Sequence, residues 1–282
     1  MTKIAMEEII KRVKDIPAFP HIVTKIIQLA ESPDSTIQDL ENTIIQDQSL
    51  TATVLRFANS THYGYSRTIS TISQATVVLG FNAIKSIAMA ASVSQLMSRE
   101  LTGYALEKEA LWRQSQTCAI TARYVAKKVK YSKPDEAYVA GLLRDIGKVI
   151  LDTYLKETMD EIYLIVEEQS ISFFEAEEKV LGFHHGQVGE SIAEKWQLPK
   201  DLTESIALHH KPEKAVINPK LAAITHIADA LVMMMGIQIG ADGLAYGFSD
   251  QALQLLGLDE DDLQQIMAEV VDLLEDEDAF KQ

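Results

Sequence analysis

Apolar residues recur along this 282-residue chain at steps of three and four, and this spacing constrains the fold more than any other feature. It is clear in Ile22, Ile26 and Ile27, and it returns in Leu40 and Ile44. Residues at such steps lie on one face of an α-helix, whereas a half-buried strand alternates apolar and polar residues. We find no convincing alternating run and no Asn-Gly hairpin turn. The sequence therefore predicts an all-α fold, a multi-helix bundle.

Local signals place several helix ends. Ser35 or Thr36 is expected to cap the helix that follows, and Gly80 is expected to stop another. A long helix is predicted over residues 107–129. A second is predicted from Asp135 to about residue 154, with Arg144 and Asp145 in its middle. Further helices are expected at residues 185–196, 200–208 and 259–277, and the last of these is interpreted as an acidic, packed helix rather than a partner-binding one.

Polar residues and Gly103 interrupt the apolar pattern near residues 98–104. We therefore predict an N-terminal helical subdomain at residues 1–100 and a second one at residues 101–282 that ends in the acidic helix. No long linker separates them, so they are expected to share a face. The polar loop at residues 59–64, which contains His62 and Tyr63, is interpreted as a connector rather than an interaction surface.

Composition restricts the function. The chain has 26 Lys and Arg residues against 41 Asp and Glu residues, a formal net charge of −15. Such an excess repels phosphate backbones and anionic lipids, so we expect neither direct nucleic-acid binding nor membrane association. There is no signal-peptide pattern and no run of about 18 apolar residues, which predicts a cytoplasmic protein. Cys118 is the only cysteine and is expected to be a buried, inert thiol rather than a nucleophile.

Several titratable residues are placed where they can converge. Two His-His pairs occur, at 184–185 and 209–210, and His226 lies three residues before Asp229 on one helix face. Asp145 stands among apolar residues, where a carboxylate is costly unless something pairs with it. Convergent titratable groups mark functional sites, so we predict a shared polar cleft.

The segment from Ala140 to Lys148 has the form of a metallohydrolase signature, with Arg144 at the position where that signature has histidine. A metal site needs neutral imidazoles and carboxylates. A guanidinium has no acceptor lone pair and keeps its positive charge, so it cannot ligate a metal. We weigh two orientations equally: Arg144 turned inward to neutralise Asp145 or Asp229, or turned to solvent while the acids pair with histidines.

Several motifs in order resemble the HDOD domain, a bacterial signalling relative of the HD-domain phosphohydrolases. The first half of the resemblance lies in the segments at residues 16–20, 45–51, 55–60 and 69–72, followed by Ala75 and Leu79-Gly80. From Leu111-Trp112 to Ala230 the chain is similar to the HD-like half. The resemblance covers roughly residues 10 to 240. It implies an HD-like helical bundle with an additional N-terminal helical subdomain.

Catalytic HD enzymes hold a divalent metal with two histidines and two aspartates, and the metal activates water against a phosphoester. By the resemblance, Gln114 and Arg144 take the places of the two histidines, whereas Asp145 and Asp229 are kept. His185 and His209 or His210 resemble the additional histidines of two-metal members. The resemblance thus implies a vestigial cleft of Gln114, Arg144, Asp145, Lys148, His185, His209, His210 and Asp229.

Three functions stay open. The first is a non-catalytic signalling adaptor that contacts other signalling proteins and needs no cofactor. The second is a phosphohydrolase with an altered ligand set, namely Asp145, His185, His209 or His210, and Asp229, which suits zinc, iron, nickel or manganese. The third is a sensor that binds a nucleotide or other anion beside Arg144 and Lys148 without turnover. Lys148 either lines this cleft or extends from a helix flank to solvent.

Overall fold

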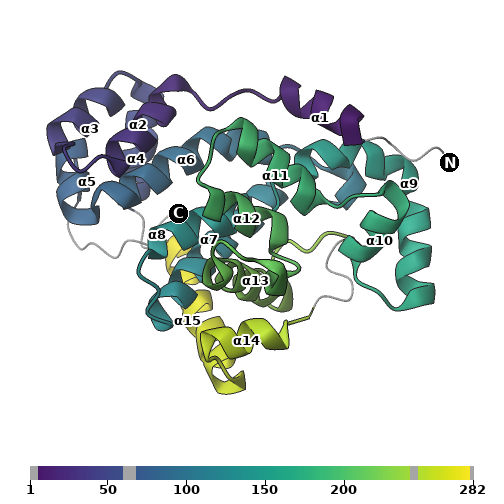
Figure 1. The fold of residues 1–282 in the computed structure, drawn as a ribbon. Coiled ribbons are helices and arrows are strands. Elements are labelled where there is room, and N and C mark those ends of the chain that lie inside the picture. Colours follow the sequence, from purple (N-terminus) through teal and green to yellow (C-terminus); the bar gives the residue numbers. More distant parts are fainter. Residues whose placement is uncertain (1–5, 60–67, 242–246, 280–282) are drawn as a thin grey trace. The chain divides into compact units, whose positions relative to one another are not determined.

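The computed structural model describes residues 6–59, 68–241 and 247–279, and within these ranges every regular element is a helix (Figure 1). A single isolated bridge joins Leu101 to Leu106. The all-α prediction is confirmed. Most of the polar loop predicted at residues 59–64 lies outside the described residues.

The chain divides into two compact units. One consists of Met1–Ala18 and Gln95–Met267, and the other of Phe19–Ser94 and Ala268–Gln282. Two helices, α6 (Phe81–Met97) and α15 (Glu260–Ala279), contribute residues to both. The subdomain boundary expected near residue 100 stays a prediction.

The smaller unit is built from α2 (His21–Glu31), α3 (Ile37–Ile44), α4 (Gln48–Ala58), α5 (Ile72–Leu79) and most of α6. Thr36 caps α3 and forms a capping box with Asp39, so the second of the two expected caps is used. Gly80 ends α5 with φ of 85°, as its position predicted. The core of this unit gathers the apolar faces that the periodicity identified, including Ile26, Leu40, Ile44, Val54 and Ile84.

The larger unit contains α1 (Met6–Asp15), the 3₁₀ turn η2 (Thr102–Tyr104), α7 (Ala110–Lys128), α8 (Pro134–Leu143), α9 (Lys148–Gln169), α10 (Phe173–Leu181), α11 (His185–Lys195), α12 (Lys200–Leu208), the turn η3 (Pro212–Lys214), α13 (Pro219–Met234) and α14 (Asp250–Leu256). Helix α7 packs against α8 and α13, and α12 packs against α8, α11 and α13. Helix α13 is buried at every residue from Leu221 to Met233, which is typical of a central helix.

Helix α1 is tied to the end of α11 by one cation. The Lys195 Nζ atom donates to the carbonyls of Val13 and Lys14, at 3.0 and 2.7 Å, and to that of Ile16. These are carbonyls at a helix end, which lack partners inside their own helix. The neighbouring Trp196 Nε1 atom donates to the Pro17 carbonyl at 3.0 Å. Lys195 thus provides hydrogen-bond donors for the carbonyls at the end of α1.

The acidic helix predicted at residues 259–277 is α15, with Leu263, Ile266 and Val270 buried along one side. Within the described residues, no single helix has the length and apolarity to cross a membrane. The α5–α6 pair meets these criteria only when taken together, and it is bent by 120° at Gly80.

Candidate functional site

The predicted continuous helix over residues 135–154 is wrong, and the correction falls on its most informative residues. Helix α8 ends at Leu143, and α9 begins at Lys148, so Arg144 and Asp145 lie in a tight connection between two helices. Its hydrogen bonds run over three residues, from Lys148 N to Asp145 O and from Ile150 N to Gly147 O, at 3.0 and 3.1 Å.

The physical reason for the break is a close backbone approach. A Cβ atom added to Gly147 would lie 2.0 Å from the carbonyl oxygen of His185 and 2.7 Å from the amide nitrogen of Gly189. Only glycine lets the start of α11 come this near. The contact is made by residues about 40 positions apart, so local periodicity does not reveal it. It brings His185 beside the Arg144–Lys148 connection.

Arg144 is fully buried and turned inward. Its Nε atom donates to Asp229 Oδ1 on α13, and its Nη2 atom lies 3.1 Å from Asp145 Oδ2. A third contact runs from Nη1 to the Gly141 carbonyl at 3.1 Å. Burial alone would lower the pKa of Arg144, but the two carboxylates raise it well above its ordinary value. The guanidinium therefore stays charged and links two helices.

Lys148 is also buried, at 1% exposure, so it does not extend to solvent. Its Nζ atom lies 2.9 Å from Asp145 Oδ2 and 5.6 Å from the centre of the Tyr104 ring. Burial raises the pKa of Asp145, but Arg144 and Lys148 outweigh it and lower that pKa far below the usual range. Asp145 is thus a carboxylate whose Oδ2 atom is held by two cations.

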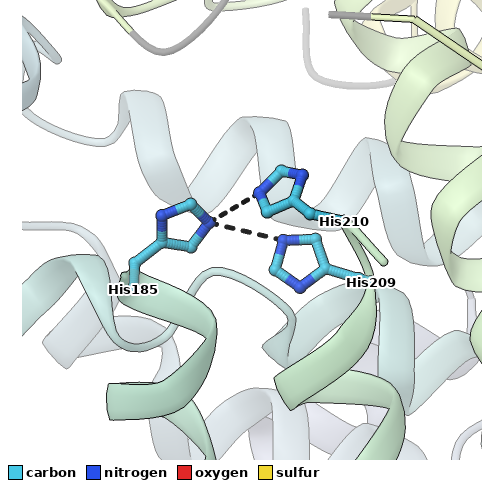
Figure 2. A group of neighbouring side chains, drawn as sticks. All are labelled: His185, His209 and His210. Atoms are coloured by element: carbon cyan, nitrogen blue, oxygen red, sulfur yellow. Dashed lines mark hydrogen bonds between the residues drawn. The ribbon is translucent and has the colours of Figure 1, made fainter. Parts of the chain in front are cut away.

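Three imidazoles meet in the arrangement of Figure 2, and two of them contact the Asp145 carboxylate. His185 comes from the first residue of α11, while His209 and His210 follow the last residue of α12. The Nε2 atom of His185 lies 3.4 Å from His209 Nε2 and 2.8 Å from His210 Nε2. Asp145 Oδ1 lies 3.4 Å from His185 Nε2 and 3.7 Å from His209 Nε2. We call His185, His209 and His210 the histidine cluster.

Each ring of the cluster also contacts a residue outside the cluster. His185 Nδ1 lies 2.8 Å from Glu177 Oε2 on α10, and His209 Nδ1 lies 2.8 Å from the Ile206 carbonyl oxygen. The partly buried His210 ring stacks on Phe174 with centroids 4.6 Å apart. Burial lowers the pKa of His209 to about 3, and burial with the two neighbouring imidazoles lowers that of His210 well below its ordinary value. Both rings are neutral at pH 7.

Other predicted residues contact different partners. The Gln114 amide is buried on α7 and donates to the Gln238 carbonyl at 3.3 Å, with Met233 Sδ at 3.8 Å. His184 caps α11 by accepting from the Gly186 amide, and burial lowers its pKa to about 4. His226 pairs with the His209 carbonyl and the Ser249 amide. Seven of the eight predicted site residues come together, and Gln114 makes separate contacts.

Sequence reasoning missed Glu177 and Tyr104. Glu177 is fully buried and accepts hydrogen bonds from the Tyr104 hydroxyl and from the His185 backbone amide, the latter at 2.7 Å. Burial raises the Glu177 pKa, but His185 and Tyr104 together lower it below its ordinary value. A signal existed, because Glu177 lies four residues from both Phe173 and Leu181, on the apolar face of its helix. Tyr104 had no comparable signal.

The arrangement decides whether a metal fits between the two aspartates, where an HD-type enzyme would hold one. The Arg144 guanidinium forms ion pairs with both carboxylates, at Asp229 Oδ1 and Asp145 Oδ2, and it cannot itself donate a lone pair. A cation there would meet a fixed positive charge in place of an imidazole. The residues present do not fit a metal between Asp145 and Asp229.

The sequence and the fold both match HDOD domain proteins. The sequence model of the HDOD domain matches residues 16–212. The fold resembles the crystal structure of an HDOD domain protein of unknown function from Geobacter sulfurreducens, with 26% identity, a TM-score of 0.73 and 98% of each chain covered.

Two other crystal structures share the fold. One, from Marinobacter aquaeolei VT8, is provisionally described as a signal transduction protein; it has 22% identity and a TM-score of 0.75, with 98% of this chain and 64% of that chain covered. The other, from Shewanella amazonensis SB2B, is provisionally described as a phosphohydrolase; it has 22% identity and a TM-score of 0.70, with 94% and 93% covered.

An uncharacterized protein of Treponema pallidum (strain Nichols) is 26% identical over 210 residues, or 74% of this chain. This chain spans only 40% of the length of that curated relative.

Proposed function

Because the chain belongs to the HDOD domain family, we propose that it is a signalling module that acts through contacts with other proteins and does not hydrolyse phosphoesters. The observation that carries the proposal is the buried guanidinium of Arg144, which forms ion pairs with both Asp145 and Asp229. In this reading the two carboxylates hold helices together instead of holding a catalytic ion.

Charge and geometry both support this role. Metal-assisted hydrolysis requires an ion that lowers the pKa of a bound water and keeps one coordination position open for it. A guanidinium binds its partners through N–H groups and has no coordination position for water. Breaking such a buried pair by removing one partner is strongly destabilising, which suits a structural function.

We infer protein partners because the charge of the chain disfavours the alternatives. With a formal net charge of −15, nucleic acids and anionic lipids are unsuitable partners. A helical module with a non-catalytic centre then transmits a signal by the surface it offers to other signalling proteins. The neighbour from Marinobacter, provisionally described as a signal transduction protein, is in keeping with this role.

A metal-dependent phosphohydrolase with an altered ligand set is the second candidate. The observation that favours it is the convergence of the His185, His209 and His210 Nε2 atoms beside Asp145. The neighbour from Shewanella is provisionally described as a phosphohydrolase. This candidate requires turnover in addition to metal binding, so a hydrolysis measurement separates it from the adaptor.

The test is hydrolysis of bis-p-nitrophenyl phosphate and of cyclic dinucleotides by the purified chain, with Mn²⁺, Zn²⁺, Ni²⁺ or Fe²⁺ supplied in turn. The adaptor proposal predicts rates equal to those of the Asp145→Ala variant with every metal. Turnover that chelation abolishes and that Asp145→Ala loses would refute it and establish the enzyme. Saturable nucleotide binding without product, lost in Arg144→Ala, would instead establish an anion sensor.

A further inference from the structure

We propose that the histidine cluster binds one divalent transition-metal ion through the Nε2 atoms of His185, His209 and His210, with Asp145 Oδ1 as a fourth ligand. This site lies beside the Arg144 pair and does not use Asp229. The inference goes beyond the signalling role and does not depend on it, because a module without turnover can still bind a metal.

The Nδ1 atoms of two cluster rings face hydrogen-bond acceptors. His185 Nδ1 faces the Glu177 carboxylate and His209 Nδ1 faces the Ile206 carbonyl, and an ionised carboxylate or a carbonyl only accepts hydrogen bonds. Each Nδ1 therefore carries the proton. An imidazole protonated on Nδ1 alone has its lone pair on Nε2, the atom that turns toward the middle of the cluster.

The Nε2 atoms of the cluster converge. His185 Nε2 lies 3.4 Å from His209 Nε2 and 2.8 Å from His210 Nε2. Asp145 Oδ1 lies 3.4 Å from His185 Nε2 and 3.7 Å from His209 Nε2. One cation at the centre would contact all four atoms.

The two oxygens of Asp145 face different groups. Both oxygens are buried and form ion pairs rather than hydrogen bonds. Oδ2 pairs with the Arg144 and Lys148 cations, whereas Oδ1 faces His185 Nε2 and His209 Nε2 at 3.4 and 3.7 Å. An unsatisfied buried carboxylate oxygen costs free energy, and this one points at two imidazole nitrogens. In a tetrahedral zinc site with ligands at about 2.0–2.1 Å, neighbouring ligand atoms are about 3.3 Å apart. The observed separations of 2.8 and 3.4 Å among imidazoles and 3.4 and 3.7 Å to Asp145 fall on both sides of that value.

His185 and His209 also have hydrogen-bond partners that orient their rings. Histidines that bind metals commonly donate their other N–H to a carboxylate or a backbone carbonyl, which orients the ring and makes it a better ligand. His185 has the carboxylate of Glu177 in this role, and His209 has the carbonyl of Ile206. Glu177 is itself held by the Tyr104 hydroxyl. The His185 and His209 rings are therefore oriented before an ion arrives.

Ligand chemistry and charge select the ion. Three imidazoles and one carboxylate favour zinc, cobalt or nickel over magnesium or calcium, which prefer oxygen ligands. At this site Arg144 and Lys148 supply two positive charges against the carboxylates Asp145, Asp229 and Glu177, which leaves one negative charge for a divalent ion to meet. His210 is only partly buried and offers the side from which an ion can enter.

The experiment is a titration of the chelator-treated, full-length chain with Co²⁺, followed by the visible absorption that tetrahedral cobalt produces, and then displacement by Zn²⁺. One equivalent of Co²⁺ is expected to bind. His210→Ala, the change at the most exposed ligand, is expected to weaken binding at least 100-fold, and His185→Ala is expected to do the same. His21→Ala is the matched control, because His21 is an exposed imidazole at the start of α2. It is expected to bind like the unmodified chain.

Circular dichroism of each metal-free variant keeps the result interpretable, and His210→Asn replaces His210→Ala if that chain fails to fold. No saturable binding by the folded chain, or equal binding by the unmodified chain and the folded His210 variant, would overturn the proposal. Binding without hydrolysis leaves the adaptor role intact. Binding with hydrolysis refutes the adaptor role alone, and the absence of binding refutes the metal site alone.

Discussion

The Nε atom of Arg144 donates to Oδ1 of Asp229, a residue 85 positions further along the chain, and both side chains are buried. This contact joins the connection after α8 to the central helix α13. It also places a permanent cation between the two carboxylates that an HD-type enzyme would use for its metal. The stability of the larger unit and its chemistry therefore depend on the same side chain.

Replacing Arg144 by methionine should lower the free energy of unfolding by about 3–5 kcal/mol, because Asp145 and Asp229 lose their shared partner in a buried place. Urea unfolding followed by circular dichroism measures this loss. The matched control is Arg113→Met, which removes an exposed pair with Glu109 and should change stability by about 0.5 kcal/mol or less. Equal losses in the two variants would show that the Arg144 contacts are not structural.

Gly147→Ala should destabilise the chain by about 1–3 kcal/mol, because the added methyl group meets the His185 carbonyl at 2.0 Å and backbone atoms cannot move aside cheaply. Since the displaced residue is a proposed ligand, cobalt affinity should fall as well. Gly247→Ala is the control, because nothing lies within 4 Å of its added Cβ atom. A Gly147→Ala chain as stable as that control would contradict the close approach between α11 and the connection after α8.

Cys118 should not react with a thiol reagent in the folded chain. It is fully buried on α7, and burial raises the pKa of its thiol well above the ordinary value despite the nearby Arg144 charge. Only the thiolate is an effective nucleophile. Because the chain has one cysteine, the colour released from a disulfide reagent reports on this site alone. We expect no release without denaturant and one equivalent upon unfolding, whereas rapid release from the native chain would contradict this account.

Glu177→Gln should weaken metal binding by about 10–100-fold, because an amide orients the His185 ring less well than a carboxylate does and makes it a poorer ligand. Glu177 is a positioning residue, so the cobalt absorption band should keep its tetrahedral form while the dissociation constant rises. Glu178→Gln is the matched control, because Glu178 pairs with Lys211 at 3.0 Å at a partly exposed position. An unchanged cobalt affinity in Glu177→Gln would show that Glu177 does not position the His185 ligand.

The sequence was most informative where local chemistry decides the structure. The helix cap at Thr36, predicted as Ser35 or Thr36, depends on neighbouring residues. The same is true of the glycine stop at Gly80 and the short helix at residues 200–208, which were also predicted. The helix expected to run through Arg144 was wrong because its interruption depends on a distant contact, the approach of Gly147 to the His185 carbonyl. No helical spacing reports such a contact.

The same limit applies to the site. The motif order brought His185, His209 and Asp145 together as candidates, but two orientations of Arg144 remained equally supported by the sequence. The choice between them depends on Asp229, which reaches Arg144 only through the packing of α13 against α8. Glu177 escaped notice because a single glutamate among charged residues resembles a solvated one. Its four-residue spacing to Phe173 and Leu181 was the available signal.

The most direct test of the account is anomalous diffraction from crystals of the chain grown with Zn²⁺ or Co²⁺ and measured at the absorption edge of the metal. The account predicts one peak among the Nε2 atoms of His185, His209 and His210, with the Arg144 guanidinium still bonded to Asp145 and Asp229. A peak that bridges Asp145 and Asp229, with Arg144 turned away, would contradict it.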